Sequence, residues 1–303
     1  MLITILLKQI CMMALLIAVG IYLRKKNLLT EHGSKDLGAI LLRVIIPCII
    51  VKSYLIECST ERLIELLSSV LLAFVGFVIA MGIAYLVYGK RRRIENFAAA
   101  FCNAGFIGIP LVQAVIGEEG VFYVAASIAL LNLFQWTYGV YIITDCKDAI
   151  SLKTIAKNPV VISIVLGLLL LVTQIPVPGV VRTTLKYISG MNTPIAMILM
   201  GTYMSKLSLK QILLCKKAYG CVVFRLFIIP AVILLAFSVI PVRNEAIMLA
   251  AYLAAATPVG TNICVFAQQY ECDYEFSVIT VCLSTLLSIV SIPIMTSIAQ
   301  LLM

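Results

Sequence analysis

Two short segments place helix-breaking residues beside amide and hydroxyl side chains in the middle of long apolar stretches. The first break carries Asn103, Gly105, Gly108 and Pro110. The second break carries Thr257, Pro258, Gly260, Thr261 and Asn262. Hydrocarbon cannot satisfy the N–H and C=O groups of an unwound segment, so such a break persists only where protein or a water-filled cavity covers it. Half-helix ends present N–H groups with partial positive charge, and we therefore expect these residues to bind an anionic group.

A packing kink is the alternative explanation for each break. Glycine and proline are common in membrane helices, and a lone proline more often bends a helix than marks a site. Either break alone favours a kink. Two breaks at matched positions, each with an asparagine nearby, favour a binding site.

Four further polar side chains within the apolar stretches are candidates for the site. Asn132 and Gln135 are equally compatible with hydrogen bonds between helices and with a place at the site. Arg43 and Arg225 lie close enough to the ends of their stretches for the charge to reach the membrane surface. All fourteen acidic residues fall in loops or near the ends of the stretches, so an arginine that stays buried would favour an anionic ligand. Both arginines are therefore possible anion partners.

The composition requires a membrane around these residues. Of 303 residues, 62% are hydrophobic and 12% are charged, against roughly 25% charged in ordinary soluble domains. A membrane-spanning helix needs about 20 mostly apolar residues, and the chain contains ten such stretches. They are residues 3–23, 37–56, 67–88, 96–116, 120–143, 159–175, 182–204, 218–240, 246–267 and 275–302. We predict an all-α polytopic membrane protein with ten transmembrane helices and no soluble domain.

The basic residues predict the orientation of these spans. One set of alternate loops holds fifteen Lys and Arg residues: Arg24, Lys25, Lys26, Lys35, Lys90, Arg91, Arg92, Arg93, Lys147, Lys153, Lys157, Lys206, Lys210, Lys216 and Lys217. The opposite set holds four: Arg62, Arg182, Lys186 and Arg243. An excess of such residues marks the cytoplasmic side, so we expect a multi-pass protein of the plasma (inner) membrane with both termini outside. Because the basic residues are spread over four loops, the net charge of +9 does not indicate nucleic-acid binding.

Matched spacings between the two halves predict an internal duplication. Three pairs have offsets of 147, 147 and 148 residues: Gly20 and Gly167, Pro47 and Pro194, and Pro110 and Pro258. Five spans per half is an odd number, so the second copy must enter the membrane upside down. We expect a single transmembrane domain, 1–303. It comprises a first repeat (1–144, spans 1–5), a cytoplasmic connector (145–158) and a second repeat (159–303, spans 6–10).

The two breaks carry a family resemblance. The run N-x-x-x-x-G-I-P-L from Asn103 to Leu111, and P-x-G-x-x-x-x-V-F-A-x-x-Y from Pro258 to Tyr270, resemble the crossover motifs of the auxin efflux carrier family. This family includes the plant PIN-type carriers and bacterial permeases, some implicated in malate or malonate transport. The chain lacks the long central hydrophilic loop of the plant carriers, so it resembles a compact bacterial-type permease and auxin is not implied.

The resemblance implies a fold like that of bile acid:sodium symporters and Na⁺/H⁺ antiporters, in which broken helices 4 and 9 cross. Spans 1, 2, 6 and 7 would form a scaffold that often dimerises. Spans 3–5 and 8–10 would form a moving transport bundle in an elevator arrangement.

The two breaks predict a secondary transporter of a small organic anion with the substrate at the crossover. The resemblance implies a dicarboxylate such as malate and elevator-type alternating access. The expected partners are the substrate, the lipid bilayer and a second copy bound through the scaffold helices. A Na⁺-coupled organic anion symporter of bile-acid-symporter type and a non-transporting membrane receptor or sensor are the alternatives. The absence of acidic residues at membrane depth argues against coupling through a buried carboxylate, and leaves uniport, exchange, and Na⁺ or H⁺ coupling by other groups open.

An enzyme is not expected. The only histidine, His32, lies in a loop, and the sequence contains neither HExxH nor paired buried acids. We predict no metal site and no cofactor.

Overall fold

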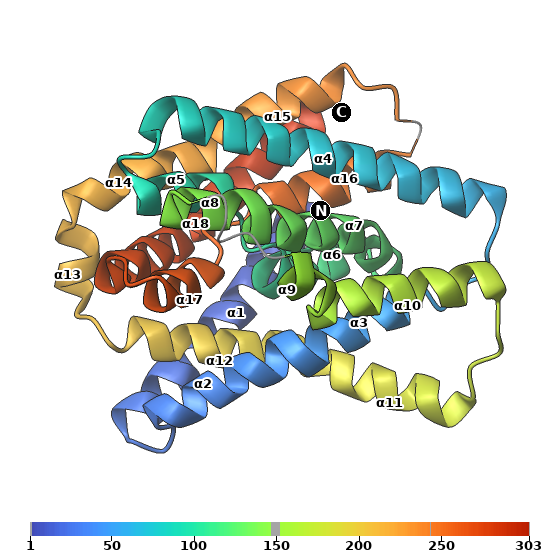
Figure 1. Ribbon diagram of the computed structural model, residues 1–303, viewed down its shortest axis with the longest axis horizontal. Coiled ribbons are helices and arrows are strands. Elements are labelled where there is room, and N and C mark those ends of the chain that lie inside the picture. Colours follow the sequence, from blue (N-terminus) through green and yellow to red (C-terminus); the bar gives the residue numbers. More distant parts are fainter. Residues whose placement is uncertain (1, 147–151, 243, 303) are drawn as a thin grey trace.

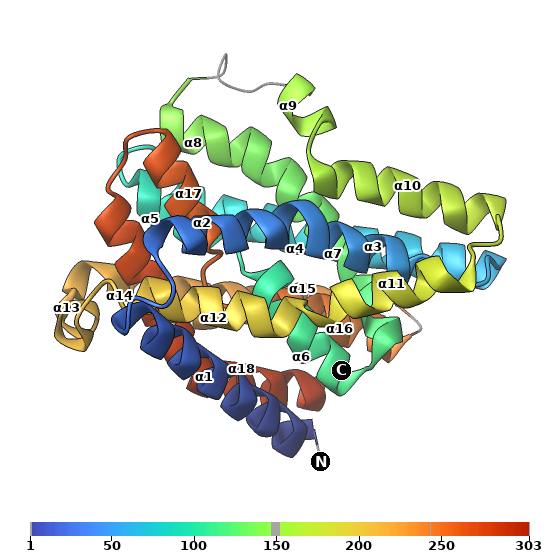
Figure 2. The ribbon, with the colours of Figure 1, turned by 90° about the horizontal axis from the view of Figure 1, so that it is seen from below.

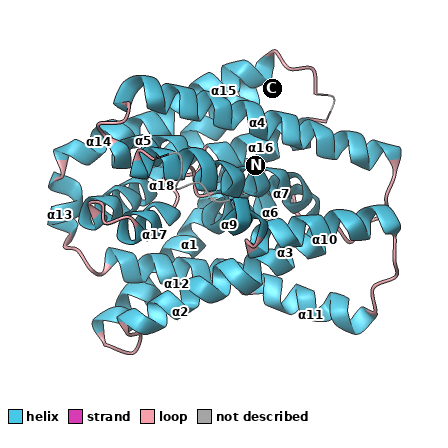
Figure 3. Ribbon diagram, viewed as in Figure 1, coloured by secondary structure: helices cyan, strands magenta, loops and turns pink. Residues whose placement is uncertain are grey.

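The computed structural model describes residues 2–146, 152–242 and 244–302 (Figure 1). Lys147 and Arg243, which belong to the predicted charge pattern, lie outside the described residues. Within the described ranges the chain forms helices and no strand (Figure 3). The prediction of an all-α chain is confirmed.

In the first half, three π-helical stretches, η1, η2 and η3, connect α-helices. The elements are α1 (Leu2–Lys25), α2 (Glu31–Ile40), η1 (Leu41–Ile45), α3 (Ile46–Ser53), α4 (Thr60–Tyr88), α5 (Arg93–Ala100), η2 (Ala104–Gly108), α6 (Ile109–Val115), α7 (Glu118–Phe134), η3 (Gln135–Gly139) and α8 (Val140–Thr144). The second half contains α9 (Leu152–Ala156), α10 (Pro159–Thr173), α11 (Gly179–Gly190), α12 (Asn192–Met204), α13 (Leu209–Leu214), α14 (Lys216–Val223), η5 (Phe224–Ile228), α15 (Ile229–Ser238), α16 (Glu245–Ala255), α17 (Asn262–Gln269) and α18 (Tyr274–Leu302).

Five helical stretches among the described residues are long and apolar enough to cross a membrane. They are Leu2–Lys25, Thr60–Tyr88, Glu118–Thr144, Lys216–Phe237 and Tyr274–Leu302. The shortest has 22 residues, which at about 1.5 Å per residue exceeds the roughly 30 Å hydrocarbon core of a bilayer. Shorter apolar helices, including α10 and α16, pack among them, as expected of a polytopic membrane protein.

Three of the π-helical turns, in which an N–H bonds the carbonyl five residues earlier, precede a proline. Pro47, Pro110 and Pro230 are each the second residue of the helix that follows such a turn. The proline ring would clash with the carbonyl four residues earlier, and widening the turn by one residue relieves that clash. The sequence predicted a distortion at Pro110, but not its π-helical form.

The helices α2–η1–α3 and α11–α12 cross one another in the lower part of Figure 1. They meet around η1, which contacts both α11 and α12. α1 lies against α12 (Figure 2), and two glycines allow close approach. A Cβ on Gly20 would lie 2.1 Å from the Ile198 carbonyl oxygen, and a Cβ on Gly201 would lie 2.2 Å from that of Ile17. The two helices therefore touch backbone to backbone.

Candidate functional site

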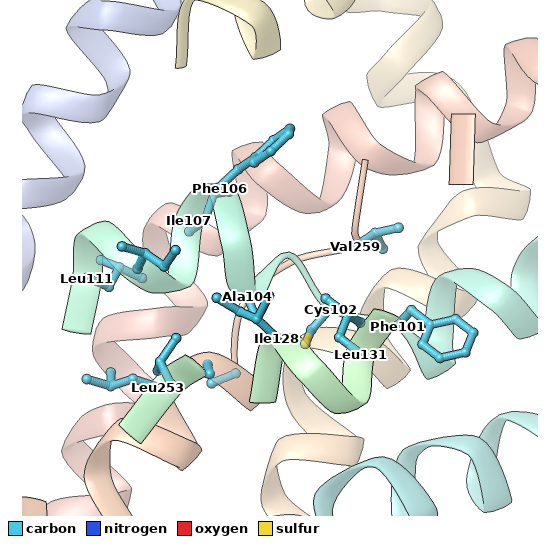
Figure 4. Close-up of a cluster of buried hydrophobic side chains, with 14 of the residues drawn as sticks. Phe101, Cys102, Ala104, Phe106, Ile107, Leu111, Ile128, Leu131, Leu253 and Val259 are labelled. Carbon is cyan, nitrogen blue, oxygen red and sulfur yellow. The ribbon is translucent and has the colours of Figure 1, made fainter. Parts of the chain in front are cut away.

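The two sequence breaks meet in the interior. The chain between α5 and η2 runs past the chain between α16 and α17, and the two pair antiparallel through Cys102 and Val259. The Asn103 N–H donates to the Pro258 carbonyl (2.9 Å), and the Gly260 N–H donates to the Phe101 carbonyl (3.0 Å). Figure 4 shows Cys102 and Val259 on these two segments, with Ile128 and Leu131 of α7 near Cys102. Each break thus satisfies backbone groups that the other exposes.

Gly260 permits this close approach. A Cβ there would lie 2.7 Å from the Cys102 carbonyl oxygen and 3.3 Å from its carbonyl carbon. The Val259 N–H donates to the Ser284 hydroxyl of α18 (3.2 Å). The Thr257 hydroxyl donates to the Ala254 carbonyl (2.7 Å), so this predicted site residue closes the end of its own helix.

Two amide donors at the crossing have no hydrogen-bond partner among the described residues. The Asn103 side-chain oxygen accepts the Phe106 N–H (3.3 Å), which leaves Asn103 Nδ2 unpaired. Asn262 Nδ2 donates to Gln135 Oε1 (2.7 Å), which leaves Gln135 Nε2 unpaired. Asn103 is 4% exposed and Gln135 is 1% exposed. A buried amide donor without a hydrogen-bond partner destabilises the protein by about 1–3 kcal/mol. A bound ligand that supplied an acceptor oxygen to either donor would remove this penalty.

A small cavity of about 30 Å³ lies between the breaks. Its polar lining comes from Asn103, Asn132, Thr261 and Asn262, together with the backbone of Gly105 and Gly260. Asn132 also donates to the Ile128 carbonyl of its own helix (2.9 Å). This volume holds about one water molecule, so a carboxylate with its carbon skeleton would require the walls to separate.

A larger cavity, which we call the vestibule, adjoins the small one. It measures about 290 Å³, close to the lower end of the roughly 300–1,000 Å³ typical of ligand pockets. The two cavities share Leu42, Phe106, Thr261 and Asn262. In Figure 4 the Phe106 side chain points away from the paired residues Cys102 and Val259.

Basic and aromatic side chains line the vestibule. Arg43, from η1, and Lys206, just after α12, both face it, with Tyr203 and Tyr274. Lys206 Nζ lies 2.9 Å from Glu31 Oε1 and 3.2 Å from the Tyr274 hydroxyl. Its hydrogen bond and positive charge hold the pKa of the Glu31 carboxyl below its usual value. Among the described residues no carboxylate lies within 4.0 Å of the Arg43 guanidinium, so Arg43 contributes a positive charge without an ion-pair partner.

A third cavity, of about 230 Å³, lies at the other end of the same helices. It is lined by Lys52 and Ser53 of α3, Gln113 of α6, Glu118 of α7 and Lys186 of α11, and it shares no residue with the small cavity. Lys52 Nζ and Glu118 Oε2 form an ion pair at 2.8 Å. In this conformation the crossing therefore adjoins the vestibule rather than the third cavity.

Arg225 lies apart from the vestibule and from the small cavity. Its guanidinium donates through Nη1 to the Ala99 carbonyl (3.1 Å) and through Nη2 to the Ala255 carbonyl. It lines a separate space of about 20 Å³ with Cys102 and Ser127. The two arginines that the sequence suggested as anion partners thus occupy different places, and only Arg43 faces the vestibule.

The remaining predicted site residues shape the break. Gly108 lets η2 approach α16, since a Cβ there would lie 3.5 Å from the Ala254 Cα. Pro110 is buried in the first turn of α6, and the Pro258 carbonyl accepts the crossing hydrogen bond. We did not predict Lys206 or Tyr203 at the site, because Lys206 was counted as a loop charge. Asn192, for which the sequence favoured a structural role, donates through Nδ2 to the Gly105 carbonyl (3.4 Å).

Comparisons with known proteins agree with a transport role. The family model described as "Membrane transport protein" matches residues 5–153 and 147–296. An uncharacterized transporter of Methanothermobacter thermautotrophicus is 24% identical over 294 residues, which cover 92% of this chain and 93% of the relative. A second uncharacterized transporter, from Methanocaldococcus jannaschii, is 22% identical over 209 residues, covering 65% and 68%.

A third relative has a substrate in its name. It is the Rhizobium meliloti protein named "Putative malonate transporter", which is 25% identical over 209 residues, covering 66% of this chain and 64% of the relative. Both matched regions of the family model together span nearly the whole chain. The chain therefore belongs to the membrane transport protein family, that of the auxin efflux carriers, and is a multi-pass membrane transporter.

Proposed function

We propose that this transporter moves a small organic anion with one or two carboxylates, which binds at the crossing of the two helix breaks. The unpaired amide donors of Asn103 and Gln135 carry the proposal. Amide N–H groups and half-helix N-termini stabilise a carboxylate without requiring a fixed positive charge beside it. The N-termini of η2 and α17 both adjoin the small cavity, which Asn103 lines and which Gln135 reaches through its hydrogen bond with Asn262.

The vestibule supports an anion rather than a cation as the substrate. Three basic residues, Lys35, Arg43 and Lys206, line it, against the single carboxylate of Glu31. A basic cavity raises the local concentration of anions before they bind. A dicarboxylate such as malate or malonate fits this charge, and the name of the Rhizobium meliloti relative supports the same class.

The proposed mechanism is an elevator. Ten spans would form two inverted repeats, with spans 1, 2, 6 and 7 as a scaffold and spans 3–5 and 8–10 as the moving bundle. The crossing would travel with the bundle, so that the site opens first to the vestibule and then toward the third cavity. The excess of Lys and Arg residues in one set of loops would place the vestibule on the cytoplasmic side of the plasma membrane and both termini outside.

The same proposal includes a homodimer formed through the scaffold helices. α11 has no buried residue, and α10 exposes Ile162, Val165 and Leu169. Such apolar surface is covered by lipid or by a second copy.

Uptake into proteoliposomes tests the function. The purified protein would be assayed with labelled monocarboxylates and dicarboxylates, with and without Na⁺ and a pH gradient. We expect saturable uptake of at least one anion, and an Asn103→Ala variant that inserts normally but does not transport it. Folded protein without saturable flux of any anion would refute the proposal.

A further inference from the structure

Arg225 carries a buried charge that no acidic side chain neutralises. It is 1% exposed, and among the described residues the ion pairs join other side chains. An isolated buried charge is strongly unfavourable. Some other negative group must therefore stabilise the guanidinium.

The ends of two half-helices provide that group. α5 ends at Ala100 and α16 ends at Ala255, and Arg225 donates to the Ala99 and Ala255 carbonyls in the last turn of each. A helix C-terminus carries about half a negative charge. The two ends together therefore carry about one negative charge, which one guanidinium offsets.

Converging carbonyls at broken helices are also the ligands by which transporters hold a coupling cation. Here the guanidinium already occupies two of them. Arginine does not lose its proton in proteins, and its side chain is covalently attached to the chain. The positive charge between the half-helix ends is therefore permanent.

We propose that Arg225 is a built-in cation, which joins the two half-helix ends of the crossing and takes the place of a coupling ion. This inference rests on the proposed transport function and specifies its coupling: anion transport requires no Na⁺ at the crossing. Arg225 is a positioning residue rather than a substrate ligand. The space beside it is about 20 Å³ and shares only Cys102 with the cavity lined by Asn103.

Thermal unfolding in NaCl and in choline chloride of equal ionic strength tests the inference without any substrate. We expect equal melting temperatures in the two salts for the wild type. Arg225→Gln removes the charge but keeps a hydrogen-bond donor, and should melt at a lower temperature in choline chloride. NaCl should raise that temperature by about 2 °C or more, since Na⁺ binds the vacated carbonyls.

Two variants control for charge and for general salt effects. Arg225→Lys keeps the charge and should show no Na⁺-specific rise. Arg91→Met removes an exposed arginine and should behave as the wild type. A Na⁺-specific rise in the wild type, or equal melting temperatures of Arg225→Gln in the two salts, would overturn the inference.

Uptake measurements complete the test. We expect wild-type uptake to be equal with and without Na⁺, and Arg225→Gln to take up the anion at least tenfold faster with Na⁺ than without. Na⁺-dependent wild-type uptake would overturn the inference. If no anion is transported, the proposed function fails, while the melting measurements still decide the role of Arg225.

Discussion

Replacing Gly260 with alanine tests whether the crossing needs backbone contact. The added Cβ would lie 2.7 Å from the Cys102 carbonyl oxygen, which is part of the main chain and cannot rotate away. The segments must separate, so the hydrogen bonds of Gly260 to Phe101 and of Asn103 to Pro258 are lost. Each buried N–H left unpaired costs about 1–3 kcal/mol. We therefore expect the free energy of unfolding to fall by about 2–6 kcal/mol.

Gly82→Ala is the matched control. Gly82 lies inside α4, and a Cβ there would meet no atom within 4 Å. Alanine is more stable than glycine inside a helix by about 0.5–1 kcal/mol, so this variant should melt at or above the wild-type temperature. Melting would be followed by far-ultraviolet circular dichroism in detergent, and transport by uptake of a labelled anion into proteoliposomes. If Gly260→Ala melts and transports like Gly82→Ala, the close approach at the crossing does not matter.

Three further predictions concern the site and its two flanking cavities. Asn103→Asp keeps the oxygen that accepts the Phe106 N–H but replaces the free amide donor with a negative oxygen. The KM for an anion should rise at least about tenfold, because a charge-assisted hydrogen bond contributes about 1.5–3 kcal/mol. An unchanged KM would place the anion elsewhere. Glu31→Gln should lower the KM measured from the vestibule side, most clearly at low salt. Because the hydrogen bond and charge of Lys206 lower the pKa of the Glu31 carboxyl, the ion pair should persist at neutral pH and be lost only as the pH falls through that lowered pKa. Glu118→Gln removes the ion pair with Lys52 that joins α3 to α7. The rate of anion exchange across the membrane should change by up to about fivefold, with little change in melting temperature. A large fall in melting temperature would show that the ion pair stabilises the fold instead.

The positions of the two breaks could be predicted from the sequence, because their signals are local. Glycine, proline and asparagine in an apolar stretch indicate a break wherever the helix lies. The sequence could not show which amide protons would be free. That depends on the Phe106 N–H turning toward Asn103 and on Gln135 of a different helix reaching Asn262.

Arg225 illustrates what local patterns leave out. The sequence suggested either solvation at the membrane surface or an anionic partner, since both follow from one side chain and its distance from the end of a span. The structure shows backbone carbonyls from α5 and α16 instead. These helix ends are far apart in sequence and converge only in the folded chain. Lys206 was missed for a related reason, because a lysine in a loop has the same pattern whether it faces solvent or a cavity.

The glycine contacts between α1 and α12 have a mechanical consequence. Helices that meet through side chains can slide, because the side chains change rotamers as the helices shift. At Gly20 and Gly201 no side chain lies between the backbones, so sliding would drive Cα and carbonyl atoms into one another. α1 and α12 should therefore move as one rigid unit. Any displacement of the crossing must then be a movement relative to this helix pair.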